Sequence, residues 1–309
     1  MAMLVTGGCG FIGHHFVRAW RRAHPGDPLL VLDALTYAAD PTRIEGLADL
    51  LVGDIAAPEA VHRAFDRLGR VDQIVHFAAE SHVDRSIAAP APFVHTNVLG
   101  TQVLLDVARE RGVGRFLHVS TDEVYGSIPA GALAVEEGAP FAPRSPYAAS
   151  KVGGEALAAA AFHTWGLPTI VARPTNTFGT GQYPEKLLPV LLRAALSGAP
   201  LPLYGDGLHE RDWLDVHEHV AALLLLLDRA APGSAWNVAG TGPRTNRSVA
   251  EAICRLLGLP HSRIVSVADR PGHDRRYHVS GSKLAALGFQ ARRPLEEALP
   301  ELLREAEGA

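Results

Sequence analysis

Lysine is nearly absent from this chain of 309 residues. Only three of its 29 basic side chains are lysine, at Lys151, Lys186 and Lys283, and the others are arginine. Lysine carries a compact ammonium group, whereas arginine carries a planar fork of N–H donors. Because arginine serves as the cation almost everywhere else, each retained lysine is a candidate for a position that requires an ammonium group.

Cysteine is also scarce, and histidine is not clustered along the chain. Cys9 and Cys254 are the two cysteines, which is too few for a disulfide framework or a cysteine-based zinc site. The fifteen histidines are scattered, and His217 and His219 are not spaced to share a helix face. We therefore expect no metal site.

Neither an excess of basic charge nor a long apolar run is present. The formal net charge is −4, which disfavours nucleic acid as a partner. The longest apolar run covers residues 220–227, whereas a membrane span needs about 20 residues. The first residues, MAMLVTGG, lack the basic flank and apolar region of a signal peptide. We expect a cytoplasmic protein that has no membrane partner.

Short apolar runs alternate with longer amphipathic segments in the first half of the chain. The runs predict strands buried on both faces of a sheet, and they lie at residues 3–6, 29–34, 49–54, 73–79, 115–121 and 168–174. The amphipathic segments predict helices near 11–24, 58–69, 93–111 and 146–165. This order predicts an α/β fold with a doubly wound parallel sheet of the Rossmann type.

After residue 174 the alternation becomes irregular. Helical patterns return at 185–197, 217–230, 247–257 and 294–306, between loops rich in proline and glycine. We predict a nucleotide-binding domain over residues 1–175 and a smaller, mostly C-terminal α/β substrate domain over residues 176–309. Segments near 212–240 are predicted to return to the first domain, with WNVAG (236–240) as a further strand.

The first apolar run leads into a glycine loop, GGCGFIG (7–13), with Gly8 at the start of the GxGxxG pattern. Glycines let the backbone approach a pyrophosphate, and the N-terminus of the following helix supplies unpaired N–H donors. The loop therefore predicts a dinucleotide site. Its candidate cofactor contacts are Gly7, Gly10, Phe11, Ile12 and Gly13.

Carboxylates end the second and third apolar runs. Asp33 comes twenty residues after Gly13, where a carboxylate accepts the adenosine ribose hydroxyls and repels a 2′-phosphate. NAD is therefore expected rather than NADP. Asp54 and Ile55 follow the third run and suit contacts to the adenine edge.

Two later motifs predict the chemistry. STDEVYG (120–126) ends the fifth run, at the edge of a doubly wound sheet where ligands bind. SPYAASK (145–151) places Tyr147 and Lys151 four residues apart on one helix face. Tyr147 would take a proton from a substrate hydroxyl as hydride leaves, and Lys151 would lower its pKa and bind the nicotinamide ribose. Ser120 or Thr121 would hold the same hydroxyl.

At these motifs the chain resembles the extended short-chain dehydrogenase/reductases that act on nucleotide sugars, and among them most resembles the dTDP-glucose 4,6-dehydratases. The resemblance covers most of the chain, and it also rests on the segments DALTYA (33–38), HFAAESHVDRSI (76–87), YPEKLLP (183–189), LYGDGLHERDW (203–213) and DRPGHDRRY (269–277). It implies bound NAD, a nucleotide-diphosphate sugar, dTDP-glucose above others, and a homodimer through helices near 93–111 and 146–165.

The adjacent carboxyls of Asp122 and Glu123 distinguish two reaction types. A C4 epimerase needs only hydride removal and return, whereas a dehydratase must also remove a C5 proton and expel the C6 hydroxyl. Two carboxyls with separated pKa values can supply base and acid. The resemblance implies Glu123 as the C5 base and Asp122 as the acid, so the chain is expected to be a lyase.

The substrate's diphosphate needs cationic or N–H donors. Arginine suits phosphate, and Arg211 and Arg270 are candidates, with Asn176 and Asn246 as hydrogen-bonding partners. The resemblance implies a full substrate set of Ser81, Thr121, Asn176, Lys186, Leu187, Pro202, Tyr204, Arg211, Asn246, Arg270 and His273. It also implies cofactor contacts from Ala78, Ala79, Thr96, Ser120, Tyr147 and Lys151.

Three features depart from the family pattern. Thr177 stands where the family has an asparagine that reaches the cofactor, Cys9 replaces a usual alanine, and an aromatic-rich C-terminal segment is missing before Ala309. Two alternatives stay open. One is a dehydratase or C4 epimerase acting on a UDP- or GDP-sugar, and the other is a non-catalytic NAD-sensing protein that binds partners.

Overall fold

The computed structural model describes residues 1–308 and divides into two compact units. The first unit comprises Met1–Val124, Ser145–Arg173 and Val220–Trp236. The second comprises Tyr125–Arg144, Pro174–His219 and Asn237–Ala309. Among residues 1–308, no helix is both long enough and apolar enough to cross a membrane.

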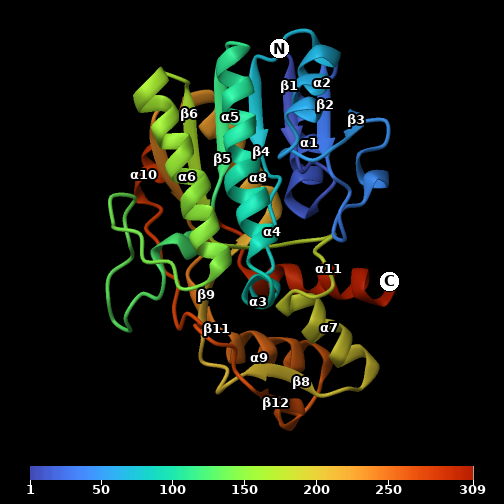
Figure 1. Cartoon of the computed structure of the whole chain (residues 1–309). Helices are drawn as coiled ribbons and strands as arrows, with labels where there is room; N and C mark the ends of the chain where they lie inside the picture. The colour runs from blue at the N-terminus through green and yellow to red at the C-terminus, as the bar shows by residue number, and fades with distance from the viewer. Residues whose placement is uncertain (309) are drawn as a thin grey trace. The chain divides into compact units, whose positions relative to one another are not determined.

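A seven-stranded sheet in the order β10-β6-β5-β4-β1-β2-β3 forms the centre of the first unit (Figure 1). Neighbouring strands pair in parallel from β3 to β6. The predicted doubly wound parallel sheet is therefore confirmed. Its strands are β1 (Met3–Thr6), β2 (Leu29–Asp33), β3 (Asp49–Val52), β4 (Gln73–His76), β5 (Arg115–Val119), β6 (Thr169–Pro174) and β10 (Ser234–Val238).

As their apolar runs predict, β1, β2 and β6 are buried along their whole length, and β4, β5 and β10 are buried except at their first one or two residues. The prediction is wrong for β3, whose residues are exposed or only half-buried. This strand lies at the edge of the sheet, so it lacks a neighbouring strand on one side, and Val52 is 55% exposed.

Helices and short turns connect the strands. The long helices α5 and α6 lie side by side in front of the sheet in Figure 1, and α5 continues directly from a π-helical segment, η2. The connecting elements are α1 (Phe11–Ala23), η1 (Pro41–Ile44), α2 (Pro58–Leu68), α3 (Val83–Ala88), α4 (Ala91–Val94), η2 (His95–Gly100), α5 (Thr101–Glu110), η3 (Asp122–Tyr125), α6 (Pro146–Trp165) and α8 (Val216–Arg229).

The second unit has two small sheets, β11-β9-β7 and β12-β8, and a separate core. Leu191, Trp213, Ile253 and Leu299 bring α7, β9, α9 and α11 together in that core. The elements are β7 (Asn176–Phe178), α7 (Leu187–Ser197), β8 (Leu201–Tyr204), β9 (Glu210–Asp215), β11 (Pro243–Thr245), α9 (Asn246–Leu257), η4 (His261–Arg263), β12 (Ile264–Val267), α10 (Ser282–Ala286) and α11 (Leu295–Gly308).

Candidate active site

The glycine loop joins β1 to α1 in a conformation that only glycine fits. Gly7 has a φ of +70°, and a Cβ there would lie 2.6 Å from the backbone nitrogen of Ala78. A Cβ on Gly13 would lie 2.3 Å from the Gly7 carbonyl oxygen. Gly10 caps α1 without a side-chain hydrogen bond to the first turn, so the helix N-terminus keeps N–H groups for an anion. The loop fits a dinucleotide pyrophosphate.

Asp33 ends β2 and is held by two backbone donors. Its Oδ2 accepts from the Cys9 amide and its Oδ1 from the Leu35 amide, both at 2.9 Å. Each carboxylate oxygen has a second lone pair, which is what two ribose hydroxyls require. Asp54 follows β3 and is half-exposed, and the adjacent Ile55 is buried.

The remaining cofactor candidates lie at the same edge of the sheet. Ala78 and Ala79 follow β4, as does the substrate candidate Ser81, and Ser120 follows β5. The hydroxyl oxygen of Ser120 is buried without a hydrogen-bond partner among the described residues. Thr96 lies in η2. A bound dinucleotide could therefore contact both the backbone of the glycine loop and the buried hydroxyl of Ser120.

Thr121, Asp122, Glu123 and Tyr147 come together in the first unit. The Glu123 amide donates to Thr121 Oγ1 at 3.3 Å, and Asp122 is only 2% exposed. Burial raises the pKa of the Tyr147 phenol, Glu123 and Asp122 raise it further, and a hydrogen bond with Thr121 lowers it. The phenol therefore favours its protonated form here, and its activation by Lys151 stays a prediction.

Lys151 is buried on the same helix, α6, four residues after Tyr147. Its Nζ donates to the Val119 carbonyl oxygen at 2.7 Å. Burial lowers the pKa of the ammonium to about 8, opposed by the charge of Glu155.

The ion pair between Glu155 and Arg173, next to Lys151 on α6, was not predicted from the sequence. Glu155 lies four residues further along α6, and Arg173 lies near the end of β6. Arg173 Nε lies 2.9 and 3.1 Å from the two carboxylate oxygens, and Nη2 makes a further hydrogen bond to Oε1. Both side chains are about 95% buried. The spacing Tyr147–Lys151–Glu155 along one helix face was the signal that could have identified Glu155.

Four of the predicted substrate residues gather in the second unit. The rings of Tyr204 and His273 meet edge to face, with centroids 5.7 Å apart. The Arg270 guanidinium lies 5.8 Å from the centroid of the Tyr204 ring, and Arg211 Nη2 lies 2.9 Å from His273 Nε2. Aromatic faces and two guanidinium groups together suit a base and a diphosphate.

The other predicted substrate residues of this unit are distributed over β7, β8, α7 and α9. Pro202 lies on β8, Lys186 and Leu187 begin α7, and Asn176 begins β7. Asn246 begins α9, and its backbone N–H donates to the His209 carbonyl oxygen at 2.9 Å.

Two departures from the family pattern have structural partners. Thr177 Oγ1 lies 2.9 Å from Nδ1 of the buried His219. The Cys9 side chain is fully buried in the glycine loop, and burial raises its pKa to about 12. Neither residue removes a candidate catalytic group.

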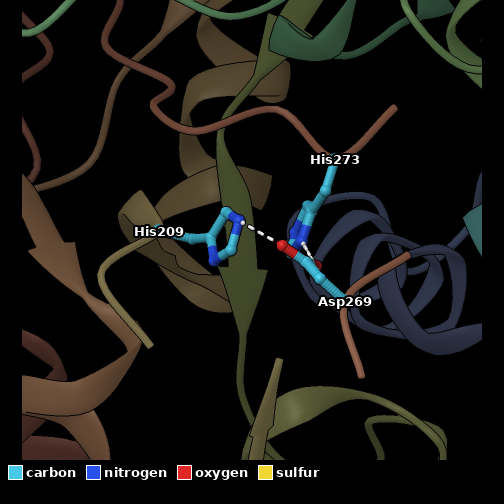
Figure 2. A group of neighbouring side chains, drawn as sticks. All are labelled: His209, Asp269 and His273. Atoms are coloured by element: carbon cyan, nitrogen blue, oxygen red, sulfur yellow. Dashed lines mark hydrogen bonds and ion pairs between the residues drawn. The ribbon is translucent and has the colours of Figure 1, made fainter. Parts of the chain in front are cut away.

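His209 and Asp269 were also missed by sequence reasoning. Figure 2 shows both beside His273, with the Asp269 carboxylate bridging the two histidines. Asp269 belongs to the DRPGHDRRY segment, which pointed to this region, but it was not singled out.

The sheet, the glycine loop, Asp33 and the Tyr147–Lys151 pair define a dinucleotide-dependent protein of the short-chain dehydrogenase/reductase type. Residues 3–239 match the model of the NAD dependent epimerase/dehydratase family, and the chain belongs to that family.

Known proteins are similar over nearly the whole chain. The dTDP-glucose 4,6-dehydratase of Streptomyces niveus is 44% identical, and the match covers 97% of this chain and 91% of the relative. The structure of DesIV, a dTDP-glucose 4,6-dehydratase from Streptomyces venezuelae with NAD and dTDP bound, gives a TM-score of 0.94 at 42% identity, covering 100% of this chain and 97% of the other. The NAD complex of UDP-glucose 4-epimerase from Thermus thermophilus gives 0.92 at 29% identity, covering 100% of each chain.

Proposed function

We propose that this protein is a lyase that dehydrates dTDP-glucose to dTDP-4-keto-6-deoxyglucose, with NAD bound at the glycine loop. The relatives at 42–44% identity with this activity support the substrate and the reaction. The backbone cradle at Gly7 and Gly13 and the carboxylate of Asp33 support the cofactor. When bound, NAD would accept the hydride from C4 and give it back at C6, so that it ends oxidised and no external reductant is consumed.

Tyr147 and Thr121 act on the C4 hydroxyl of the sugar. Thr121 holds the oxygen by a hydrogen bond, and Tyr147 takes its proton as the carbon is oxidised. Lys151 orients the nicotinamide ribose and favours the phenolate form of Tyr147.

The adjacent carboxyls carry out the elimination. A ketone at C4 acidifies the C5 proton, which Glu123 removes. Asp122 then donates a proton to the C6 hydroxyl, which leaves as water. Glu123 returns a proton to C5 as hydride is restored at C6, which gives the 4-keto-6-deoxy sugar. Asp122 is only 2% exposed, so it would deliver this proton in a site shielded from bulk water.

The observation that carries the proposal is the pair of adjacent carboxyls on η3, directly after Thr121. The Glu123 amide donates to Thr121 Oγ1 at 3.3 Å, Asp122 is only 2% exposed, and the charges of both carboxylates raise the pKa of Tyr147. A C4 epimerase requires no such acid and base beside the tyrosine.

A turnover assay without added reductant tests this function. The purified protein is incubated with dTDP-, UDP- and GDP-hexoses, and products are followed by mass spectrometry. We expect loss of one water from dTDP-glucose. An isomer of unchanged mass would establish the epimerase alternative instead, and retention of NAD without turnover of any sugar would favour the sensor.

We also propose a homodimer in the cytoplasm. Val94 and Leu99, which are 54% and 47% exposed, lie on the segment that leads into α5, and Trp165, 49% exposed, ends α6. Covering these apolar side chains would favour association. Light scattering coupled to size-exclusion chromatography measures the oligomeric state, and replacing Leu99 by aspartate should shift it toward monomer.

A further inference from the structure

A carboxylate in the second unit bridges two stacked histidine rings (Figure 2). Asp269 Oδ1 lies 2.6 Å from His273 Nδ1, and Oδ2 lies 3.3 Å from His209 Nε2. The two ring centroids are 3.7 Å apart, and the ring planes differ by 17°. The side chains of both histidines are at least 96% buried.

Arg211 determines where the His273 proton lies. Its Nη2 is 2.9 Å from His273 Nε2, and a guanidinium group can only donate hydrogen bonds. Nε2 of His273 therefore accepts and carries no proton. Burial lowers the pKa of His273 to about 4, so the ring is neutral at pH 7, and its one proton sits on Nδ1 and is donated to Asp269.

This arrangement argues against a metal ion, although the three side chains offer ligand atoms within 4.8 Å of one another. A cation bound between them would need an unprotonated Nδ1 on His273, and the ring proton would then move to Nε2, facing an N–H of Arg211. In addition, ring nitrogens direct their lone pairs within the ring planes, and stacked planes that differ by 17° do not meet near the two nitrogens, where an ion would have to lie. The cluster is built for hydrogen bonding.

The guanidinium of Arg211 is held on its other sides as well. Nη1 donates to the Glu210 carbonyl oxygen at 2.7 Å, and Nη2 donates to the Asp274 carbonyl oxygen at 2.9 Å. Its carbon lies 4.2 Å from the Tyr277 ring centroid. The side chain is 5% exposed. The hydrogen bond to His273 differs from these contacts. It depends on the Asp269 carboxylate, which keeps the His273 proton on Nδ1 and so leaves Nε2 free to accept from Arg211.

We propose that Asp269 and His209 are positioning residues for nucleotide recognition: Asp269 holds His273 in the tautomer that accepts from Arg211, and His209 supports the ring by stacking. Arg211 is thereby fixed in the plane needed to meet the diphosphate of a nucleoside diphosphate. This inference rests on the proposed function, in which Arg211 binds that group. An arginine fixed before binding loses less conformational freedom when phosphate arrives.

Three variants test the proposal in the full-length protein. Asp269→Ala removes both acceptors, and His209→Gln removes the stacked ring. Glu297→Gln is the control, because Glu297 is an exposed acid in the first turn of α11, in the same unit. Calorimetry measures binding of dTDP, steady-state kinetics separate KM from kcat, and long-range ¹H–¹⁵N spectra report the His273 tautomer.

We expect Asp269→Ala to weaken dTDP binding and raise KM by about tenfold, the equivalent of one hydrogen bond, with kcat changed by less than about twofold. His209→Gln should have a smaller effect in the same direction, and Glu297→Gln none. The wild-type spectrum should show the proton on Nδ1, and Asp269→Ala should convert His273 into a mixture of tautomers.

Wild-type dTDP affinity and an unchanged His273 spectrum in Asp269→Ala would overturn the positioning role while leaving the proposed function intact. Stoichiometric binding of Zn²⁺ that His209→Gln abolishes would overturn it in favour of a metal site. If the wild-type protein binds no nucleoside diphosphate and turns over no sugar, the proposed function fails, and this inference fails with it.

Discussion

The ammonium of Lys151 donates a 2.7 Å hydrogen bond to the Val119 carbonyl oxygen, at the end of the strand that precedes the candidate catalytic residues. This bond ties the N-terminal third of α6 to the edge of the sheet, just before Ser120 and Thr121. Lys151, one of the three lysines, therefore has a structural role through Val119 as well as its proposed chemical role beside Tyr147.

Replacing Lys151 with arginine should reduce kcat by at least about 100-fold, because a planar guanidinium cannot occupy the buried ammonium position without displacing its neighbours. Lys283→Arg is the matched control. Lys283 lies on α10 and is not fully buried. The kcat of the Lys283→Arg variant should therefore stay within about twofold of the wild-type value. Steady-state kinetics, normalised to bound NAD, measure both. An active Lys151→Arg protein would refute a specific need for the ammonium.

Replacing Glu123 with glutamine should abolish elimination, because the amide cannot accept the C5 proton. Loss of a general base lowers a rate by about 10²–10⁴-fold. In heavy water, mass spectrometry and NMR should detect deuterium at C5 of the wild-type product and none in sugar recovered from the variant. Full turnover by Glu123→Gln would show that another group is the base.

Replacing Glu155 with glutamine should destabilise the first unit by about 3–5 kcal/mol, because the buried Arg173 would lose its counter-charge. Urea unfolding followed by circular dichroism measures the change. The double variant Glu155→Leu with Arg173→Met should recover much of that stability, since both charges are then absent. If the single and double variants are equally unstable, packing rather than charge explains the loss.

The free energy of unfolding should fall as the pH drops below about 6.5. Burial lowers the pKa of His76 to about 3, so between pH 6.5 and 3 the unfolded chain binds a proton at this position that the folded chain does not. Stability contributed by the neutral ring is present above pH 6.5 and is lost as the pH falls. At pH 5 the loss for His76 is about 2 kcal/mol.

Urea unfolding at pH 7, 6 and 5 tests this dependence. His76→Gln removes one titrating ring and should make the decline less steep, while His163→Gln, on the more exposed end of α6, serves as the control. An identical decline in wild type and His76→Gln would locate the acid sensitivity elsewhere.

The first half of the fold could be predicted because its physical signals are local. Strands such as β2 are continuous apolar runs, and the glycine loop and the Tyr147–Lys151 spacing lie within a few residues. Helix α6 was predicted with the same bounds that the structure has.

The sites that sequence reasoning missed depend on residues far apart in the chain. Asp269 and His209 are sixty positions apart, and the segment between them has no periodicity that would bring them together. The Glu155–Arg173 pair likewise joins a helix to a separate strand. Short strands such as β7 and β11 are three residues long, too short for an alternating pattern to be recognised.

The two backbone hydrogen bonds that Asp33 accepts give this residue a second, structural role. Its carboxylate is proposed to select the cofactor. It also holds the glycine loop in place by a hydrogen bond from the Cys9 amide, and the turn after β2 by one from the Leu35 amide. Redesign of this protein for NADP by a simple change at Asp33 would therefore loosen the pyrophosphate loop itself, and a successful redesign needs a replacement acceptor for both amides.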